Sequence, residues 1–222
     1  MNVIEKIIDI YRVKFRDKIY NPIWGGQNLK RINYKKFTII SNNCWGGHVY
    51  RYFSSSYDSP TVGLYFFAED YMRFLGDLRS YISKDLNFIR RDESKYREEL
   101  ERRNVTCPIG ILGDVEVVFL HYKTEAEALN KWNRRCQRIH WDSLYIKFSE
   151  MNLCNLRLLE EFDRLDYQHK IVFTTKDYGL KSQVIFKDYE GSNEINNDTL
   201  HFRKFINLIK WINGEKDFRR NQ

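Results

Sequence analysis

The sequence predicts an α/β protein in three layers (α/β/α), with helices on both faces of a mostly parallel central sheet. Short apolar runs of strand length alternate along the chain with segments in which apolar residues recur every three or four positions. The runs are apolar throughout, which is typical of parallel strands buried on both faces. Because strands and helices follow one another in turn, this architecture is favoured over a helical bundle or a β-sandwich.

Length and composition fit one globular domain with a short appendage. The chain has 222 residues, of which 42% are hydrophobic and 30% charged, so it can bury a core without disulfides or a metal. We expect an N-terminal helix and connector at residues 1–30 and an α/β domain at residues 31–222. The charge-dense segment 84–104 fits a surface insertion.

The first helix is expected at residues 2–18, and Asn21-Pro22 and Gly25-Gly26 should end it. Either its apolar stripe docks on the body of the protein, or it meets a membrane surface or a partner helix. The stripe consists of Ile4, Ile7, Ile8, Tyr11 and Phe15.

Six strands are expected, most of them rich in β-branched or aromatic residues. Pro60 opens the second strand, and a turn-rich segment at 108–113 leads into the third. The expected strands are residues 37–42, 61–67, 115–122, 143–148, 171–175 and 183–187.

Helices are expected between most of these strands. Glu69 and Asp70 place negative charge at the positive end of one helix dipole, and Thr124 with Glu127 forms a capping-box pattern at the start of another. The expected helices are residues 48–54, a segment that begins at Glu69-Asp70, and residues 124–139, 153–165 and 199–213.

The segment from Phe37 to Gly47 is the strongest candidate for a functional site, because a buried strand ends there in polar residues, a cysteine and two glycines. Cys44 is a candidate nucleophile, with His121 as its base and Asp142 orienting the imidazole. His121 ends another expected strand and would reach the same edge of a parallel sheet. The alternative is that Cys44 is a small buried residue and His121 a satisfied histidine.

Polar and aromatic residues near this edge are candidates for binding a sugar. Amide and carboxylate groups can recognise hydroxyl groups, an indole can stack on a sugar ring, and glycines let a substrate approach the backbone. The alternative for the asparagines is turn chemistry. The candidates are Asn42, Asn43, Trp45, Gly46, Gly47, Asp70 and Tyr122.

A basic stripe is expected on the helix at 124–139. Lys131, Arg134, Arg135 and Arg138 share one face through their i, i+3, i+4 and i+7 spacing. Arg134 and Arg135 are the candidates to grip a nucleotide or lipid diphosphate, because guanidinium groups match phosphate oxygens. The alternative is a solvated face paired with nearby carboxylates.

Several classes of protein are disfavoured. The chain has no GxGxxG, Walker A, HExxH, GxSxG or Asp-X-Asp motif, and its four cysteines form no CxxC pair. We expect no cofactor, no metal and no nucleic-acid partner, since long basic tracts are also missing. The net charge of +7 suits a phosphate, a sugar nucleotide or a membrane surface, although an ordinary basic surface has the same composition.

No secretory pattern opens the chain, and no apolar run approaches the roughly 20 residues that span a bilayer. We expect a cytoplasmic protein, with peripheral attachment to the inner membrane face as an alternative.

The motif from Ser41 to Gly47 resembles a bacterial family of unassigned function, DUF1919, whose members are often labelled exopolysaccharide biosynthesis proteins. The resemblance implies an α/β fold and a cytosolic protein tied to surface-polysaccharide gene clusters. Further matches, in the family's order across roughly residues 36–190, are Ser59–Leu64, Asp70–Tyr71, Pro108–Gly110, Phe119–Tyr122, Lys131–Arg135 and Arg138–Asp142.

Three hypotheses for function follow. The first is a transferase in surface (exo- or capsular) polysaccharide biosynthesis, which modifies a glycan or its activated precursor, a sugar nucleotide or a lipid phosphate. The second is a non-catalytic glycan- or partner-binding module of a polysaccharide assembly complex. The third is a Cys-His hydrolase, which uses the same site with water as acceptor.

Overall fold

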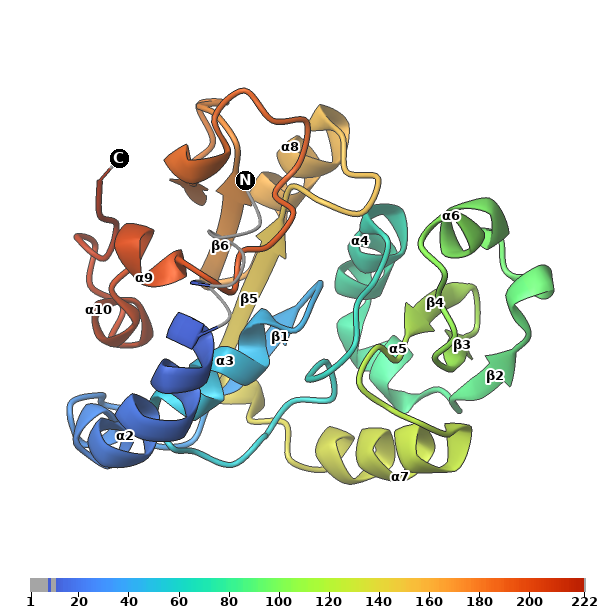
Figure 1. Cartoon of the computed structure of the whole chain (residues 1–222), viewed down its shortest axis with the longest axis horizontal. Helices are drawn as coiled ribbons and strands as arrows, with labels where there is room; N and C mark the ends of the chain where they lie inside the picture. The colour runs from blue at the N-terminus through green and yellow to red at the C-terminus, as the bar shows by residue number, and fades with distance from the viewer. Residues whose placement is uncertain (1–7, 9–10, 222) are drawn as a thin grey trace.

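The computed structural model describes residue 8 and residues 11–221 and contains two lobes, each built around a sheet (Figure 1). The larger lobe holds a four-stranded sheet of order β1-β5-β6-β7, in which each pairing is parallel. The α/β class and the parallel sheet that the sequence predicts are therefore confirmed. The strands are β1 (Thr38–Ser41), β5 (Leu144–Ser149), β6 (His169–Thr174) and β7 (Gln183–Ile185).

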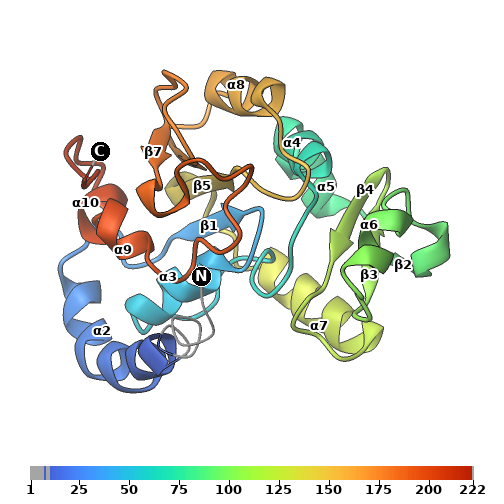
Figure 2. The ribbon, with the colours of Figure 1, turned by 45° about the horizontal axis from the view of Figure 1, so that its top comes forward.

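Helices cover both faces of the parallel sheet, so the three predicted layers are present (Figure 2). Successive strand residues face opposite cores: Ile39 and Tyr145 pack on one side, Ile40 and Ile146 on the other. On the first side lie α3 (Trp45–Tyr52), α9 (Phe202–Phe205) and α10 (Leu208–Ile212), and on the second α4 (Ala68–Gly76) and α8 (Leu156–Arg164).

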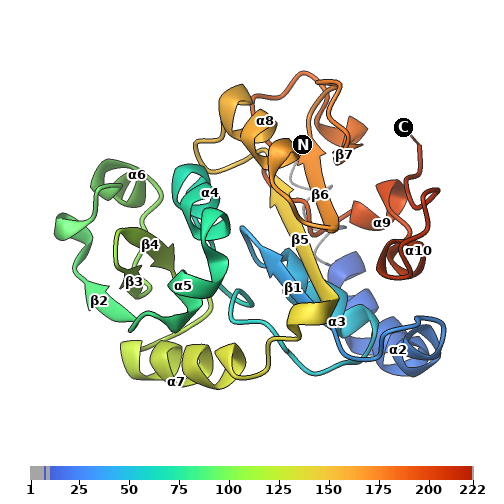
Figure 3. The ribbon, with the colours of Figure 1, turned by 180° about the vertical axis from the view of Figure 1, so that it is seen from behind.

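The smaller lobe is built on an antiparallel sheet of order β2-β3-β4, which the sequence analysis does not predict (Figure 3). The expected third strand forms part of this sheet rather than of the parallel one. This strand is the second strand of a hairpin whose turn contains Gly113 at a φ of +67°. Because a turn this short can join only antiparallel neighbours, the strand cannot enter the parallel sheet. The elements are β2 (Asn87–Ile89), β3 (Ile109–Leu112), β4 (Val115–Val118), α5 (Leu78–Ser83), α6 (Arg97–Arg102) and α7 (Glu125–Cys136).

The segment expected as a strand at 61–67 begins with a turn at 61–63 and forms no regular strand, so this prediction is wrong. Gly63 has a φ of +85°, which interrupts an extended chain. A single bridge between Tyr65 and Val118 is what remains of strand pairing. The charge-dense segment 84–104, in turn, contains β2, η2 (Arg91–Glu93) and α6.

The N-terminal helix continues through Asn21-Pro22, where the sequence predicts that it ends. Residues 11–15 are helical, the π-helical turn η1 (Arg16–Tyr20) follows, and α2 (Asn21–Lys30) continues directly. The Asn21 N–H donates to the Arg16 carbonyl five residues back. This wider turn admits Pro22 in the first turn of α2, where a missing N–H costs least. Ile4 and Ile7 lie outside the described residues.

The helix expected at 199–213 is broken into α9 and α10. Ile206 between them is extended and bridges to Arg219, and the Asn207 side chain then caps α10 by accepting the Lys210 N–H. Two short 3-10 turns, η3 (Trp141–Ser143) and η4 (Lys187–Tyr189), complete the elements named here. Within residue 8 and residues 11–221, no helix has both the length and the apolarity to cross a membrane.

Candidate functional site

Two adjoining cavities open beside the carboxyl ends of β1 and β5. Both are lined by Cys44, His48 and His121. The first, of about 400 Å³, we call the amide cavity, because Asn43, Asn152, Asn196, Asn197 and Asp198 line it. The second, of about 280 Å³, we call the basic cavity, because Arg51, Lys131 and Arg135 line it.

The two asparagines at the end of β1 have different positions. Asn42 is fully buried and clamps β1 to β5, since its amide donates to the Ser149 carbonyl at 3.2 Å and accepts the Ser149 N–H at 3.1 Å. Asn43 accepts the Trp45 N–H at 3.1 Å, at the start of α3, and its amide lines the amide cavity. Asn43 therefore borders the amide cavity, but its side-chain NH2 already donates to both Asp198 carboxylate oxygens at 2.9 Å.

A buried ion pair lies behind the amide cavity. Lys147 and Asp198 have no exposed side-chain surface, and the Lys147 ammonium donates to the Asp198 carboxylate. Lys147 also donates to the Asn43 amide oxygen at 3.0 Å, and Asp198 accepts from Ser149 Oγ at 2.6 Å. Burial lowers the pKa of Lys147, against the opposing effect of Asp198. Asp198 is held rigidly, so the amide cavity has a fixed, oriented wall.

Sequence reasoning missed both members of this pair. The position of Lys147 in the middle of the apolar run Leu144–Ser149 was the available signal. A charge in a strand buried on both faces is rarely unpaired, so it indicates a buried partner of opposite charge. Asp198 gives no local signal, since it lies in a loop 51 residues further along the chain.

The Cys44 thiol has neither the environment nor the contacts of an activated nucleophile. Burial, followed by the charge of Asp198, raises its pKa to about 12. Its Sγ donates to the Leu64 carbonyl oxygen at 3.7 Å. The thiol therefore keeps its proton at neutral pH and forms part of the wall between the two cavities.

In the first turn of α3, two backbone N–H groups already have hydrogen-bond partners and are not free to bind an anion. The Trp45 N–H is bound by Asn43, and the Gly46 N–H donates to Ser41 Oγ at 3.4 Å. A Cβ on Gly46 would lie 3.2 Å from the same Ser41 oxygen. Gly46 therefore serves close packing against β1, whereas Gly47 lines the basic cavity.

We expect Cys44 to react slowly with iodoacetamide in the folded protein at neutral pH. The shift from the usual 9.0 to a pKa of about 12, three pKa units, leaves about a thousandfold less thiolate. Mass spectrometry of the alkylated Cys44 peptide, with the urea-unfolded chain as control, measures the rate. Faster labelling of Cys44 in the folded than in the unfolded chain would contradict this account.

His121 lies beside Cys44, as the sequence predicts, but it arrives from the other lobe. It follows β4, and its backbone N–H donates to the Gly63 carbonyl at 3.0 Å. Among the described residues, its ring makes no hydrogen bond and faces both cavities. Burial, followed by the charge of Arg51, lowers the pKa of His121, so the imidazole is neutral at pH 7.

Asp142 cannot orient His121, so this prediction is wrong. It belongs to η3 at the amino end of β5, where Leu144 pairs with Thr38 at the start of β1. Cys44 and His121 lie beyond the other end of these strands. The six residues of β5 separate the two edges by roughly 20 Å.

Trp45 and Asp70 are also unavailable to a ligand. Trp45 is fully buried, with edge-to-face contacts to Phe173, Phe202 and Trp211. Asp70 is buried in α4 and accepts from Lys95 at 2.6 Å and from the Glu116 N–H at 2.7 Å. Both residues hold the fold together; the sequence shows their polarity and aromaticity but not the side to which they point.

The basic stripe of α7 divides between the cavity and solvent. Lys131 and Arg135, one turn apart, line the basic cavity together with Tyr122, whereas Arg134 is exposed and lines neither cavity. Arg135 Nη1 donates to the Tyr122 hydroxyl at 2.5 Å and to the Val62 carbonyl at 2.9 Å. The i, i+3, i+4 spacing of Lys131, Arg134 and Arg135 shows that they share a helix face. It does not show which of them line the basic cavity.

Arg51 of α3 completes the basic cavity and was missed by sequence reasoning. Its Nη2 contacts the ring nitrogens of His48 at 3.0 and 3.2 Å, and its Nε lies 3.4 Å from Asp17. Burial lowers the pKa of His48, against the opposing effect of a hydrogen bond to the Asp17 carboxylate, so this imidazole is neutral too. Among the described residues, no three His, Cys, Asp or Glu side chains are grouped to hold a metal ion.

Comparison with known proteins places the chain in a family. The model of a family described as "Domain of unknown function (DUF1919)" matches residues 16–213. The chain belongs to this family. The match includes both lobes and the residues that line both cavities. A relative, an uncharacterized protein of Haemophilus influenzae, is 28% identical over 193 residues, which cover 83% of this chain and 87% of the relative.

Proposed function

We propose that this chain is a transferase that binds a phosphate-bearing sugar precursor, a sugar nucleotide or a lipid-linked sugar phosphate, across the two cavities. The phosphate groups occupy the basic cavity and the sugar occupies the amide cavity. The surface-polysaccharide setting of the reaction is carried over from the labels of the family that the sequence resembles.

The observation that carries the proposal is the buried guanidinium of Arg135. Arg135 is only 7% exposed, yet no carboxylate of the described residues pairs with it. Both of its hydrogen bonds to the described part of the chain leave from Nη1, so Nη2 and Nε remain for a ligand. Because a buried charge without a counter-charge is costly, an anionic ligand in the basic cavity would be strongly favoured.

The other cations of the basic cavity strengthen this preference. Arg51 shares the single carboxylate of Asp17 with Arg16, and Lys131 pairs with Glu127 on the solvent side of α7. No Asp or Glu of residue 8 or residues 11–221 lines the basic cavity. Guanidinium forks match the oxygens of a diphosphate, so the cavity suits such a group.

The amide cavity provides the complementary half. Asn196 and Asn197 line this cavity with exposed side chains, and side-chain amides recognise sugar hydroxyls. Asn43 and Asn152 line it as well, but their amides are held by hydrogen bonds to Asp198 and to the Phe66 carbonyl. Tyr65 lines the same cavity and offers an aromatic surface. The donor's sugar would therefore lie next to His121, where the two cavities meet.

His121 would act as the general base. It takes the proton of an acceptor hydroxyl, whose oxygen then forms a bond to the sugar carbon that carries the phosphate. The bond from that carbon to the phosphate oxygen breaks, and the leaving diphosphate keeps the electron pair beside Arg135. A neutral imidazole is the required form, and burial with the nearby Arg51 charge supplies it by lowering the pKa of His121.

The non-catalytic binding module remains the second candidate, because the carboxylate that lines the amide cavity, Asp198, is already bound by Lys147 and Ser149 in a buried network. A Cys-His hydrolase fits less well, because a thiol with a pKa of about 12 is a poor nucleophile at neutral pH.

Calorimetric titration with uridine diphosphate glucose and with pyrophosphate tests the proposal. Arg135→Gln should weaken binding about tenfold to a hundredfold, because it removes a charge-assisted hydrogen bond. Lys131→Gln, on the partly exposed side of the cavity, should weaken it less and is not expected to disturb folding.

Arg134→Gln is the matched control, since the neighbouring residue of the same helix lines neither cavity. Its affinity should equal that of the unmodified protein. Equal affinities for the Arg134, Arg135 and Lys131 variants, or no binding of either probe, would refute the proposal.

A further inference from the structure

The N-terminal helix turns its large apolar side chains outward. Tyr11, Phe15 and Ile23 are 68%, 59% and 61% exposed, and Ile8, Ile19 and Trp24 are exposed as well. We call these six residues the apolar stripe. A helix of a soluble domain ordinarily faces its apolar residues toward the core, so this orientation is inverted, and contiguous apolar surface of this kind marks an interaction site.

The side of the same helix that packs on the protein combines polar residues with two apolar contacts, Tyr20 and Leu29. Asn21 and Asn28 are buried, and Asp17 forms ion pairs with Arg16 and Arg51. Asn28 donates to the Tyr52 carbonyl at 3.3 Å, which fixes α2 on α3. These polar contacts fix the rotation of the helix about its axis, and they keep the apolar stripe facing outward.

The π-helical turn helps to keep the stripe in line. Tyr11, Phe15, Ile19 and Ile23 recur every four residues. In an ordinary helix, such a repeat drifts by about 40° at each step. The wider turn at Arg16–Tyr20 takes up part of this drift, so the apolar side chains stay on one side of the helix.

The exposed charges beside the stripe are cationic. Lys14, Lys18, Lys30 and Arg31 are exposed, and the one acid between residues 11 and 57, Asp17, is held against the protein. Tyr11 and Trp24 are residue types that favour a membrane interface, where an apolar ring and a polar tip meet different surroundings.

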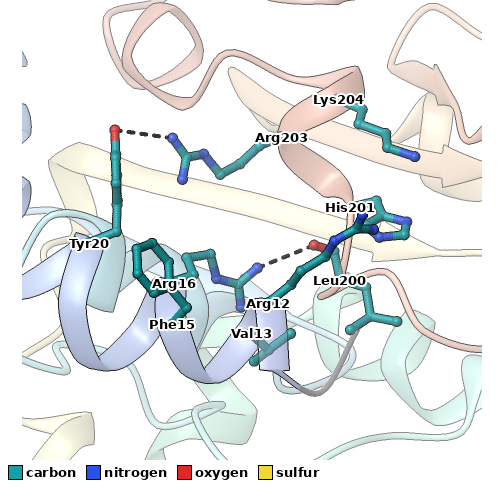
Figure 4. A pocket seen from close by; sticks show the side chains of 9 residues that line it. All are labelled: Arg12, Val13, Phe15, Arg16, Tyr20, Leu200, His201, Arg203 and Lys204. Carbon is teal, nitrogen blue, oxygen red and sulfur yellow. Dashed lines mark hydrogen bonds between the residues drawn. The ribbon is translucent and has the colours of Figure 1, made fainter. Parts of the chain in front are cut away.

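A basic groove lies directly beside the stripe (Figure 4). This cavity of about 310 Å³ runs between the N-terminal helix and α9, and Phe15 belongs to both the stripe and the groove. The guanidinium groups of Arg12, Arg16 and Arg203 lie in it, together with Lys204. An anionic headgroup could enter this groove while acyl chains contact the stripe.

We propose that the apolar stripe and its basic flank dock the protein on an anionic lipid surface. A second copy of the chain fits this face less well, because a two-fold pairing of like stripes would bring the cationic flanks of both helices together. An anionic bilayer instead complements the flank charge and accepts the apolar side chains at the same time.

Co-sedimentation of the full chain with lipid vesicles tests this proposal. The protein should pellet with vesicles that contain phosphatidylglycerol and much less with vesicles of phosphatidylcholine alone, and sodium chloride should weaken the binding. The variant Tyr11→Ser/Phe15→Ser/Ile19→Ser should bind at least about tenfold more weakly, because it removes apolar area from the membrane contact. Lys14→Glu/Lys18→Glu should lose the preference for anionic vesicles.

Leu156→Ser is the matched control, because Leu156 is similarly exposed but lies on α8, away from the stripe. It should bind vesicles as the unmodified protein does. Equal binding to both kinds of vesicle, unchanged binding of the stripe variant, or a dimer in sedimentation equilibrium that the stripe variant abolishes would overturn the proposal.

Discussion

Replacing Lys147 with methionine should lower the free energy of unfolding by about 3–5 kcal/mol, because it leaves the carboxylate of Asp198 buried without its counter-charge. The same carboxylate would keep its bonds from Ser149 and Asn43, but these neutral donors do not replace an ammonium group. Urea unfolding followed by circular dichroism measures the change.

The double variant Lys147→Met/Asp198→Leu separates the ion pair from the loss of packing. With both charges gone, much of the stability should return, since an apolar pair can replace a buried ion pair at little cost. Lys176→Met, at an exposed position, should change stability by less than about 0.5 kcal/mol. A Lys147→Met protein as stable as the Lys176→Met control would show that the buried pair has no such role.

Replacing His121 with glutamine should lower turnover of the proposed transfer by about 10²–10⁴-fold and leave binding of the donor nearly unchanged. Release of uridine diphosphate from uridine diphosphate glucose measures turnover, and calorimetry measures binding. Since burial and the Arg51 charge lower the pKa of His121, the unmodified enzyme should be active at neutral pH. Activity should fall as the pH drops through this lowered pKa, below the ordinary value of 6.5.

His169→Gln is the matched control for His121. This histidine also has a pKa lowered by burial, but it begins β6 at the opposite edge of the sheet and stacks on Tyr145. Its turnover should be normal. Donor binding without turnover in the unmodified protein, together with unchanged binding in the His121 variant, would favour the non-catalytic module over the transferase.

Local patterns in the sequence predicted the parts of the site that depend on one segment. The run from Phe37 to Ser41 showed a buried strand, and the polar residues after it placed Asn43 and Cys44 at a carboxyl edge. The capping pattern of Thr124 and Glu127 located the start of α7, and with it Lys131 and Arg135. In each case the information lies within a few residues of the feature.

Features that depend on distant segments could not be predicted in this way. His121 reaches Cys44 because an antiparallel hairpin, rather than a parallel crossover, carries it to the cleft, and the apolar run of β4 suits either arrangement. Asp142 was assigned to the wrong edge, although it directly precedes the strand expected at 143–148. That position places it at the amino end of a parallel strand, opposite the edge of Cys44. The pairing of Lys147 with Asp198 depends on a loop that follows both β6 and β7.

A crystal structure with bound pyrophosphate would show whether the basic cavity binds phosphate through Arg135. We expect the anion in this cavity, within hydrogen-bond distance of the Arg135 guanidinium and beside Arg51 and Lys131. Pyrophosphate bound elsewhere, with the basic cavity left to solvent, would contradict this expectation.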